Sequence, residues 1–183
     1  MKKDANTFRI YADGAISYKN KIGGIGFIIS CDSDPTTYFQ YSQAFNETDE
    51  DPVTNIRMEL MSVILSLDLL STELFTQTGC TVSNATVIVH SDSAYVINGI
   101  NQYVRRWEMN GWENNEGKPV SNRDLWERLR AIQRKYKRNK LSFVKVDGHS
   151  GNFFNELSDS LAQTSAHGKP VNKRIRQKSS SNK

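Results

Sequence analysis

Four acidic residues stand where the local pattern would accept a neutral or apolar side chain: Asp13, Glu59, Asp92 and Asp159. A carboxylate among apolar residues is costly unless it is paired or binds a metal. Carboxylate oxygens are typical ligands of Mg²⁺ and Mn²⁺. Two such ions about 3.5–4 Å apart can activate water and stabilise the leaving oxygen of a phosphodiester. We therefore expect Asp13 to be the first ligand of a divalent-metal nuclease site that the other three acids complete.

Each acid also has a simpler interpretation when it is taken alone. Asp13-Gly14 is equally compatible with a turn, and any of the four acids is compatible with a surface charge or a helix cap. Cys31 and Cys80 are isolated in the sequence, so no Cys–His set with zinc-ligand spacing competes for a metal. The set of acids along the chain, rather than any single one, favours the metal site.

The strands that must position these acids are predicted from apolar and β-branched runs. Five are expected, over residues 8–15, 22–30, 37–44, 86–91 and 141–146. Short links make the first three an antiparallel meander. The run over 86–91 is nearly all apolar or β-branched, as in a strand buried on both faces by parallel pairing. Asp92 follows its C-terminal end, where sites form in open α/β sheets.

Helices carry the other two acids. Thr54 or Asn55 can cap a long helix with an apolar stripe, and Glu59 lies in its first turn. Further helices are expected over 93–100 and 102–109, from Asn122 or Asp124 onward, and over 155–166. The last of these carries Asp159 on its first turns.

The length of 183 residues fits one domain with a tail. No stretch of eighteen uncharged apolar residues is present, so we expect no membrane span. The first residues lack an apolar signal segment, and the two cysteines are interpreted as reduced thiols, so a cytoplasmic protein is expected.

The formal net charge of +4 is unevenly distributed. Six of the 24 basic residues follow His167, in a stretch without acids: Lys169, Lys173, Arg174, Arg176, Lys178 and Lys183. The remaining 18 basic residues stand against 20 acidic ones. The basic character that suggests nucleic acid therefore lies mostly on the Lys/Arg/Ser tail, which we expect to be disordered.

Several motifs resemble type 1 ribonuclease H in order and spacing. They are YADGA at 11–15, TNIRMEL at 54–60, HSDS at 90–93, GHSG at 148–151 and NELSD at 155–159. The segment from Gly111-Trp112 through Asn122 to Asp124-Leu125-Trp126 matches as well. GHSG and NELSD lie close together and count as one; a single motif would be weak evidence, but four in order with the tryptophan segment are strong. The resemblance covers about residues 8–166.

This resemblance implies an α/β fold. The ribonuclease H-like sheet would have five strands, three antiparallel and then two parallel, flanked by helices. Residues 8–166 would form the catalytic domain, with residues 1–7 as an N-terminal extension and 167–183 as the tail. The implied activity is hydrolysis of the RNA strand of RNA–DNA hybrids, leaving 5′-phosphate and 3′-hydroxyl ends. We expect a monomer.

The family's metal-binding acids match Asp13, Glu59, Asp92 and Asp159, which would hold two Mg²⁺ ions, or Mn²⁺, with substrate. The resemblance implies that Asp13 bridges both ions and that Glu59 also lies near a ribose 2′-hydroxyl. His149 matches a loop histidine that assists proton transfer or product release, although a structural histidine is the alternative. His90 is predicted to be structural, and His167 to be only a tail residue.

The resemblance also implies contacts to both strands of the hybrid. Gly14, Asn55 and Ser93 match positions that approach the RNA backbone or its 2′-hydroxyls. Thr54 and Asn122 match a pocket for a DNA phosphate.

Tyr103, Trp107 and Trp112 lie in the segment that follows the DNA strand, where aromatic rings can stack on sugars and bases. At helical spacing, Trp107 and Trp126 are equally compatible with core positions.

The chain departs from the family pattern in its substrate contacts. Ile56 stands where Asn or Gln is usual, Ala94 where Gln is frequent, and Pro52 where Arg is frequent in the phosphate pocket. The protruding segment carries Glu108 and Glu113 where lysines are common. These departures predict that the catalytic residues are intact and that the contacts with substrate are altered.

Two other functions remain open within the same fold. One is a hybrid-binding module with little or no catalysis, against which the presence of all four acids argues. The other is a DNA-directed nuclease or integrase, which usually lacks the Arg-Met-Glu-Leu helix start and the His-Ser-Gly loop.

Overall fold

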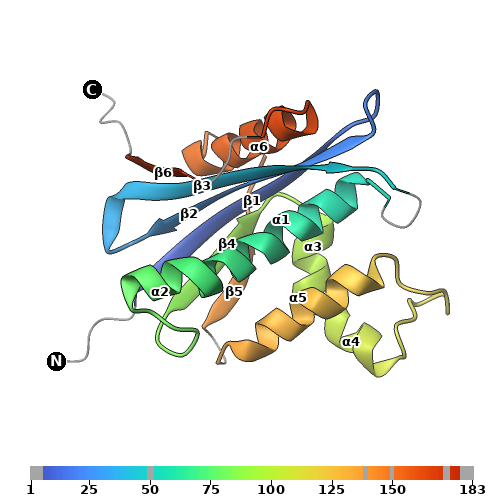
Figure 1. Ribbon diagram of the computed structural model, residues 1–183. Coiled ribbons are helices and arrows are strands. Elements are labelled where there is room, and N and C mark those ends of the chain that lie inside the picture. Colours follow the sequence, from blue (N-terminus) through green and yellow to red (C-terminus); the bar gives the residue numbers. More distant parts are fainter. Residues whose placement is uncertain (1–5, 49–51, 138–139, 149–150, 171–173, 178–183) are drawn as a thin grey trace.

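The structure is a computed structural model that describes residues 6–48, 52–137, 140–148, 151–170 and 174–177. One mixed sheet forms its centre, with helices on both faces (Figure 1). Helix α6 (Phe153–Ala166) covers one face, and α1 (Asn55–Leu69) packs on the other. Helix α5 (Arg123–Lys135) packs against α1.

The strands are β1 (Thr7–Ser17), β2 (Ile22–Cys31), β3 (Asp34–Asn46), β4 (Thr86–Ser91), β5 (Leu141–Lys145) and β6 (Arg174–Gln177). They lie in the order β5-β4-β1-β2-β3-β6. β1, β2 and β3 are antiparallel neighbours, whereas β4 and β5 run parallel to β1. The predicted five-stranded mixed sheet is thus confirmed.

The register between β1 and β4 determines where two of the acids meet. Tyr11 pairs with His90 in the parallel ladder. Asp13 and Asp92 each follow two residues later, so both come to the same place along neighbouring strands. The sheet alone therefore brings together two of the predicted ligands from opposite halves of the domain.

The tail differs from expectation at residues 174–177, which form β6. This strand pairs antiparallel with β3, from Thr37 opposite Gln177 to Gln40 opposite Arg174. The outer edge of β3 would otherwise present unpaired backbone N–H and C=O groups, and pairing satisfies them. The prediction of a disordered tail is therefore wrong for these four residues. For 171–173 and 178–183, the prediction lies outside the described residues, as do residues 1–5 of the predicted N-terminal extension.

Two helical segments are longer than predicted. The expected helices over 93–100 and 102–109 form one run, because α3 (Ala94–Asn98) continues through a π-helical turn, η2 (Gly99–Tyr103), into α4 (Val104–Met109). In the same way α1 continues through the π-helical turn η1 (Leu70–Leu74) into α2 (Phe75–Thr78).

The core lies mainly between the sheet and α1. The predicted apolar stripe, which runs along α1 into the start of η1, is fully buried: Leu60, Val63, Ile64, Leu67 and Leu70. Trp126 of α5 is also fully buried, which confirms its core position. Among the helices of the described residues, none combines the length and the apolar character that crossing a bilayer requires.

Candidate active site

Three of the predicted acids form a compact cluster at the centre of the sheet. Asp13 lies in β1, Glu59 in the first turns of α1, and Asp92 directly after β4. One carboxylate oxygen from each lies within 4.8 Å of the other two. The Asp13 and Glu59 side chains are buried, with 6% and 7% of their surface exposed, whereas Asp92 is half-buried.

Gly14 allows α1 to bring Glu59 to the strand. A Cβ at Gly14 would overlap the backbone nitrogen of Glu59 and the carbonyl carbon of Met58. The start of α1 is fixed by Thr54, whose hydroxyl accepts a hydrogen bond from the Arg57 amide at 3.2 Å. Thr54, rather than Asn55, is thus the cap, and the capped first turn rests directly on β1.

Gly26 has the same role for α6 on the opposite face. A Cβ at this glycine would overlap the carbonyl oxygen of Ser158 and approach Ala162. Because Gly26 pairs with Asp13 in the β1–β2 ladder, the helix backbone comes close to the cluster. This contact carries Asp159, the residue after Ser158, to the same region.

The cluster is electrostatically strained without a cation. Burial, and then the negative charges of Asp92 and Asp159, raise the pKa of Asp13 to about 7. Burial, and then the charges of Asp13 and Asp92, raise the pKa of Glu59 to about 10. Glu59 therefore favours the protonated form at neutral pH and Asp13 is partly protonated there, unless a bound cation replaces the protons.

The donor set fits a hard divalent cation. All three donors are carboxylate oxygens, the ligands that Mg²⁺ and Mn²⁺ prefer. In addition, the Glu59 Oε2 atom is buried and has no hydrogen-bond partner among the described residues. A buried oxygen without a partner is costly, and coordination to a cation would satisfy it.

Asp159 lies at the margin of this cluster rather than within it. Its Oδ1 accepts a hydrogen bond of 2.8 Å from Gln163 Nε2, one helical turn later. Asp159 also lines an open cavity of about 480 Å³ together with Gly14 and Asn55. Gln163 and His167 line it as well, so His167, expected only as a tail residue, reaches the neighbourhood of the site.

His149 lies outside the described residues, but the residue before it does not. Gly148 lies against Asp92, and a Cβ there would be 3.0 Å from Asp92 Oδ2. The loop that carries His149 therefore starts next to the acidic cluster. His90, by contrast, stacks on Tyr11 with ring centroids 4.6 Å apart, in agreement with its predicted structural role.

Thr54 and Asn122, predicted to bind a DNA phosphate, both contact Arg57. Besides the Thr54 cap, Arg57 Nη1 donates to Asn122 Oδ1 at 3.4 Å. The same guanidinium forms a bidentate pair with Asp124, at 3.1 and 3.0 Å, which lowers the pKa of Asp124. This pair joins the starts of α1 and α5 and was not predicted as functional, although both residues belong to the quoted motifs.

Ser93, predicted to approach the RNA strand, follows Asp92 and caps α3 by accepting a hydrogen bond from Val96 N at 3.4 Å. Asn55 is exposed at the start of α1 and lines the same cavity as Asp159. The structure thus gathers Gly14, Asn55 and Ser93 around the acids.

The aromatic segment divides into an exposed and a buried part. Tyr103 is 44% exposed and lies 5.8 Å from Trp107, centroid to centroid, and both line a surface cavity of about 250 Å³ with Arg106. Trp112 is only 8% exposed and is covered by Arg123, whose guanidinium carbon lies 5.5 Å from the ring centroid. Little of the Trp112 ring is therefore open for stacking, and its contact with the DNA strand stays a prediction.

Glu108 does not add free negative charge to this segment. Its carboxylate is paired with Arg130 at 2.9 Å and Arg134 at 2.6 Å. Arg105 and Arg106 of the same helix are exposed. The segment is therefore less acidic toward a substrate than its sequence indicates, and these two arginines are further candidates for phosphate contacts.

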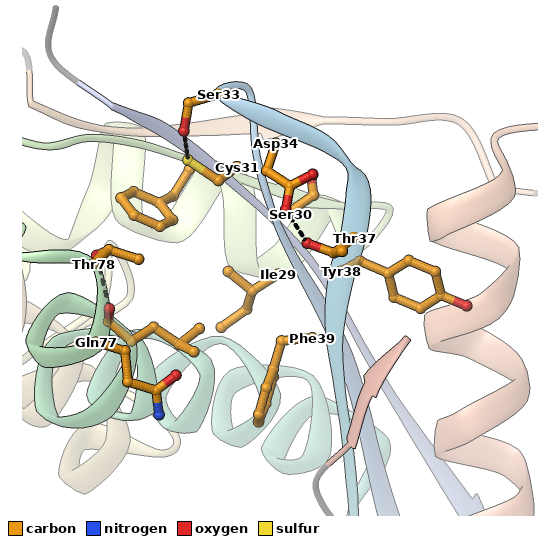
Figure 2. A pocket seen from close by; sticks show the side chains of 12 residues that line it. Ile29, Ser30, Cys31, Ser33, Asp34, Thr37, Tyr38, Phe39, Gln77 and Thr78 are labelled. Atoms are coloured by element: carbon orange, nitrogen blue, oxygen red, sulfur yellow. Dashed lines mark hydrogen bonds between the residues drawn. The ribbon is translucent and has the colours of Figure 1, made fainter. Parts of the chain in front are cut away.

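A further cavity, of about 190 Å³, lies away from the acids, between the ends of β2 and β3 and helix α2 (Figure 2). Ile29 and Phe39 line it from the sheet, and Gln77 and Thr78 from the helix. None of the four acids is among its described lining residues, so it is separate from the candidate site.

Comparison with known proteins identifies the family of this chain. The RNase H family model matches residues 5–167. A ribonuclease H of Paramagnetospirillum magneticum is 35% identical over 157 residues, which is 86% of this chain and 88% of the relative. A ribonuclease H of Syntrophomonas wolfei is 36% identical over 155 residues, which is 84% of this chain and 92% of the relative.

Solved structures show the same fold. LC9-RNase H1, described as a type 1 RNase H with the type 2 active-site motif, superposes with a TM-score of 0.68 at 22% identity, over 91% of this chain and 77% of that one. LC11-RNase H1 in complex with RNA/DNA hybrid gives a TM-score of 0.60 at 20% identity, over 86% of this chain and 97% of that one. The matching family model and the curated relatives show that the chain belongs to the ribonuclease H family.

Proposed function

We propose that this protein hydrolyses the RNA strand of RNA–DNA hybrids by a two-metal-ion mechanism, leaving 5′-phosphate and 3′-hydroxyl ends. The observation that carries the proposal is the cluster of Asp13, Glu59 and Asp92, with carboxylate oxygens within 4.8 Å of one another. Membership of the ribonuclease H family supports the choice of substrate.

Asp13, Glu59 and Asp92 would hold the metal, with Asp159 as a further ligand from the margin of the cluster. When bound, Mg²⁺ or Mn²⁺ would supply an activated water and stabilise the leaving 3′-oxygen. Hydrolysis breaks the bond between phosphorus and the 3′-oxygen, which takes up a proton, while the water oxygen stays on the phosphate. These atoms account for the two proposed product ends.

The protein residues would orient the hybrid and move the proton. Gly14, Asn55 and Ser93 surround the acids from three elements, which suits contact with the cleaved strand. We assign to His149 the transfer of a proton to the leaving oxygen or assistance in product release, since its loop begins against Asp92.

The second strand would lie along α4 and the start of α5. Arg57, Thr54 and Asn122 offer a cation and polar groups for one DNA phosphate. Tyr103, with 44% of its surface exposed, offers a ring for stacking on a sugar or base. One chain supplies all of these groups, which supports a monomeric enzyme.

The test is cleavage of a labelled RNA–DNA hybrid with Mg²⁺, beside single-stranded RNA and double-stranded DNA. We expect the RNA strand of the hybrid to be cut and both controls to remain intact. End-specific ligation of the products would report the 5′-phosphate and the 3′-hydroxyl. Binding of hybrid without cleavage would instead identify an inactive hybrid-binding module, and cleavage of DNA would contradict the proposed substrate.

A further inference from the structure

Gln163 donates a hydrogen bond to Asp159. The pair is separated by four residues on α6, and the bond runs from the amide Nε2 to Asp159 Oδ1 over 2.8 Å. Both side chains line the cavity that also contains Gly14 and Asn55. Gln163 thus belongs to the surroundings of the site, although the NELSD motif that precedes it on α6 ends at Asp159.

The backbone of α6 is already fixed, which leaves the side chain of Asp159 as the variable part. The close contact at Gly26 fixes the helix on the sheet near Ser158. The His167 ring contacts the last turn of α6, where its Nδ1 lies 2.8 Å from the carbonyl oxygen of Gln163. The orientation of the Asp159 carboxylate therefore depends on what its oxygens contact.

The negative charge of Asp13 opposes the approach of the Asp159 carboxylate to the proposed metal site. The charge of Asp159 raises the pKa of Asp13, so the two carboxylates repel each other across the site. Gln163 donates to one Asp159 oxygen without adding charge of its own. The other oxygen, Oδ2, remains available as a ligand.

We propose that Gln163 is a positioning residue for the metal centre: its amide holds Asp159 Oδ1 and leaves Oδ2 to coordinate a divalent cation. This inference rests on the proposed function, in which Asp159 is a metal ligand. Hydrogen-bonded partners of ligating carboxylates typically change metal affinity by about 10–100-fold when they are removed. Because Gln163 is exposed, we expect the lower end of that range.

The test compares Gln163→Met with Gln77→Met. Methionine has similar length and helix propensity but cannot donate a hydrogen bond. Gln77 is an exposed glutamine of α2, beside the separate cavity of Figure 2, and is the matched control. Dissociation constants for Mn²⁺ are measured calorimetrically without substrate, and hybrid cleavage is measured as a function of Mg²⁺.

We expect Gln163→Met to weaken Mn²⁺ binding about 10-fold and to raise the half-saturating Mg²⁺ concentration similarly. The maximal rate at saturating Mg²⁺, the KM for hybrid and the Tm of the metal-free protein should stay unchanged. Gln77→Met should match the parent throughout. In an Asp159→Asn background, the effect of Gln163→Met should disappear, because the positioned carboxylate is gone.

Unchanged metal affinity in Gln163→Met would overturn the inference. A rise in KM with parental metal affinity would overturn it too, by showing that Gln163 contacts the nucleic acid directly. The failure of the proposed function is distinguishable, since it would appear as absent hybrid cleavage in the parent protein. If the parent cleaves hybrid and Asp159→Asn weakens the metal while Gln163→Met does not, only the positioning role fails.

Discussion

Gly14 and Glu59 are in such close contact that a Cβ on the glycine would overlap the backbone nitrogen of Glu59. This contact sets the distance between β1 and the first turns of α1. It thereby brings the Glu59 carboxyl close to the carboxyl of Asp13, the residue before Gly14 in β1. The glycine thus has a packing role in the metal site that is independent of any contact with RNA.

Asp13→Asn should abolish hybrid cleavage while the fold survives. The substitution removes one of the mutually repelling carboxylates, so the Tm of the metal-free variant should be no lower than that of the parent. Cleavage assays with Mg²⁺ and thermal melts in EDTA measure the two effects. Asp32→Asn, on the surface beside Arg9, is the control and should retain activity. Near-normal turnover by Asp13→Asn would contradict the site.

The metal-free protein should lose stability as the pH rises. Asp13 and Glu59 have pKa values raised to about 7 and about 10, against ordinary values of about 3.9 and 4.3 in unfolded chains. Between the ordinary and the raised pKa of each group, the folded state binds more protons than the unfolded state. The free energy of unfolding therefore falls with increasing pH. The fall should extend from about pH 4 to about pH 7 through Asp13, and further through Glu59.

Melting temperatures between pH 5 and pH 9 in EDTA would measure this slope. Mg²⁺ should reduce it, because the cation stabilises the ionised carboxylates of the folded protein. The double variant Asp13→Asn/Glu59→Gln should flatten the slope in EDTA. A Tm that rises with pH in the metal-free parent would have the opposite sign and contradict the electrostatic account.

Arg57→Lys should weaken hybrid binding without changing the chemistry. Lysine keeps the charge but loses the planar bidentate contact with Asp124 that holds the group beside Thr54 and Asn122. We expect KM to rise several-fold, with kcat and Mg²⁺ affinity retained. Arg128→Lys, in an exposed pair with Asp68, is the matched control. A loss of kcat with unchanged KM would place Arg57 in the chemistry instead.

His149→Ala should slow turnover without abolishing it. General acid–base assistance is typically worth about 10²–10⁴-fold, and solvent can supply part of it. Its motif neighbour Gly148 lies against Asp92, which supports a role beside the acids. Single-turnover rates separate proton transfer from product release. A variant as inactive as Asp13→Asn would show a larger role than we assign.

Sequence alone predicted the elements whose signals are local, and the residues that lie in recognisable motifs. Asp13, Glu59 and Asp92 belong to such motifs, and the structure brings them together. The pairing of Arg57 with Asp124 depends on how α1 packs against α5, and no local pattern encodes it. Gln163 gave no signal, because a glutamine four residues after an aspartate is ordinary on a helix.

Two features depend on packing that local patterns do not encode. The resemblance placed Trp112 in the segment along the DNA strand, whereas its ring is largely buried beneath Arg123. Residues 174–177 were expected to be disordered because the tail is rich in Lys, Arg and Ser. Composition carries no information about the open edge of β3 with which they pair.

The last prediction concerns the six basic residues of the tail. Hybrid binding requires cations, because phosphate neutralisation and counterion release supply much of the affinity. The rest of the chain has 18 basic residues against 20 acidic ones. The tail leaves α6 at Gly168, next to His167 and the cavity beside Asp159, before it reaches β3. We therefore expect it to raise affinity for hybrid without setting specificity.

The sharper variant replaces all six tail lysines and arginines by glutamine, because deleting residues 168–183 also removes β6 from the edge of β3. In the glutamine variant, KM should rise and its salt dependence should flatten. Each lost phosphate contact should remove about 0.7–0.9 from the log–log slope. The maximal rate should change little, since the proposed metal site ends at Gln163. The deletion should reproduce these effects and also lower the Tm. An unchanged KM and slope at low salt would leave the tail with a structural role only, through the pairing of β6 with β3.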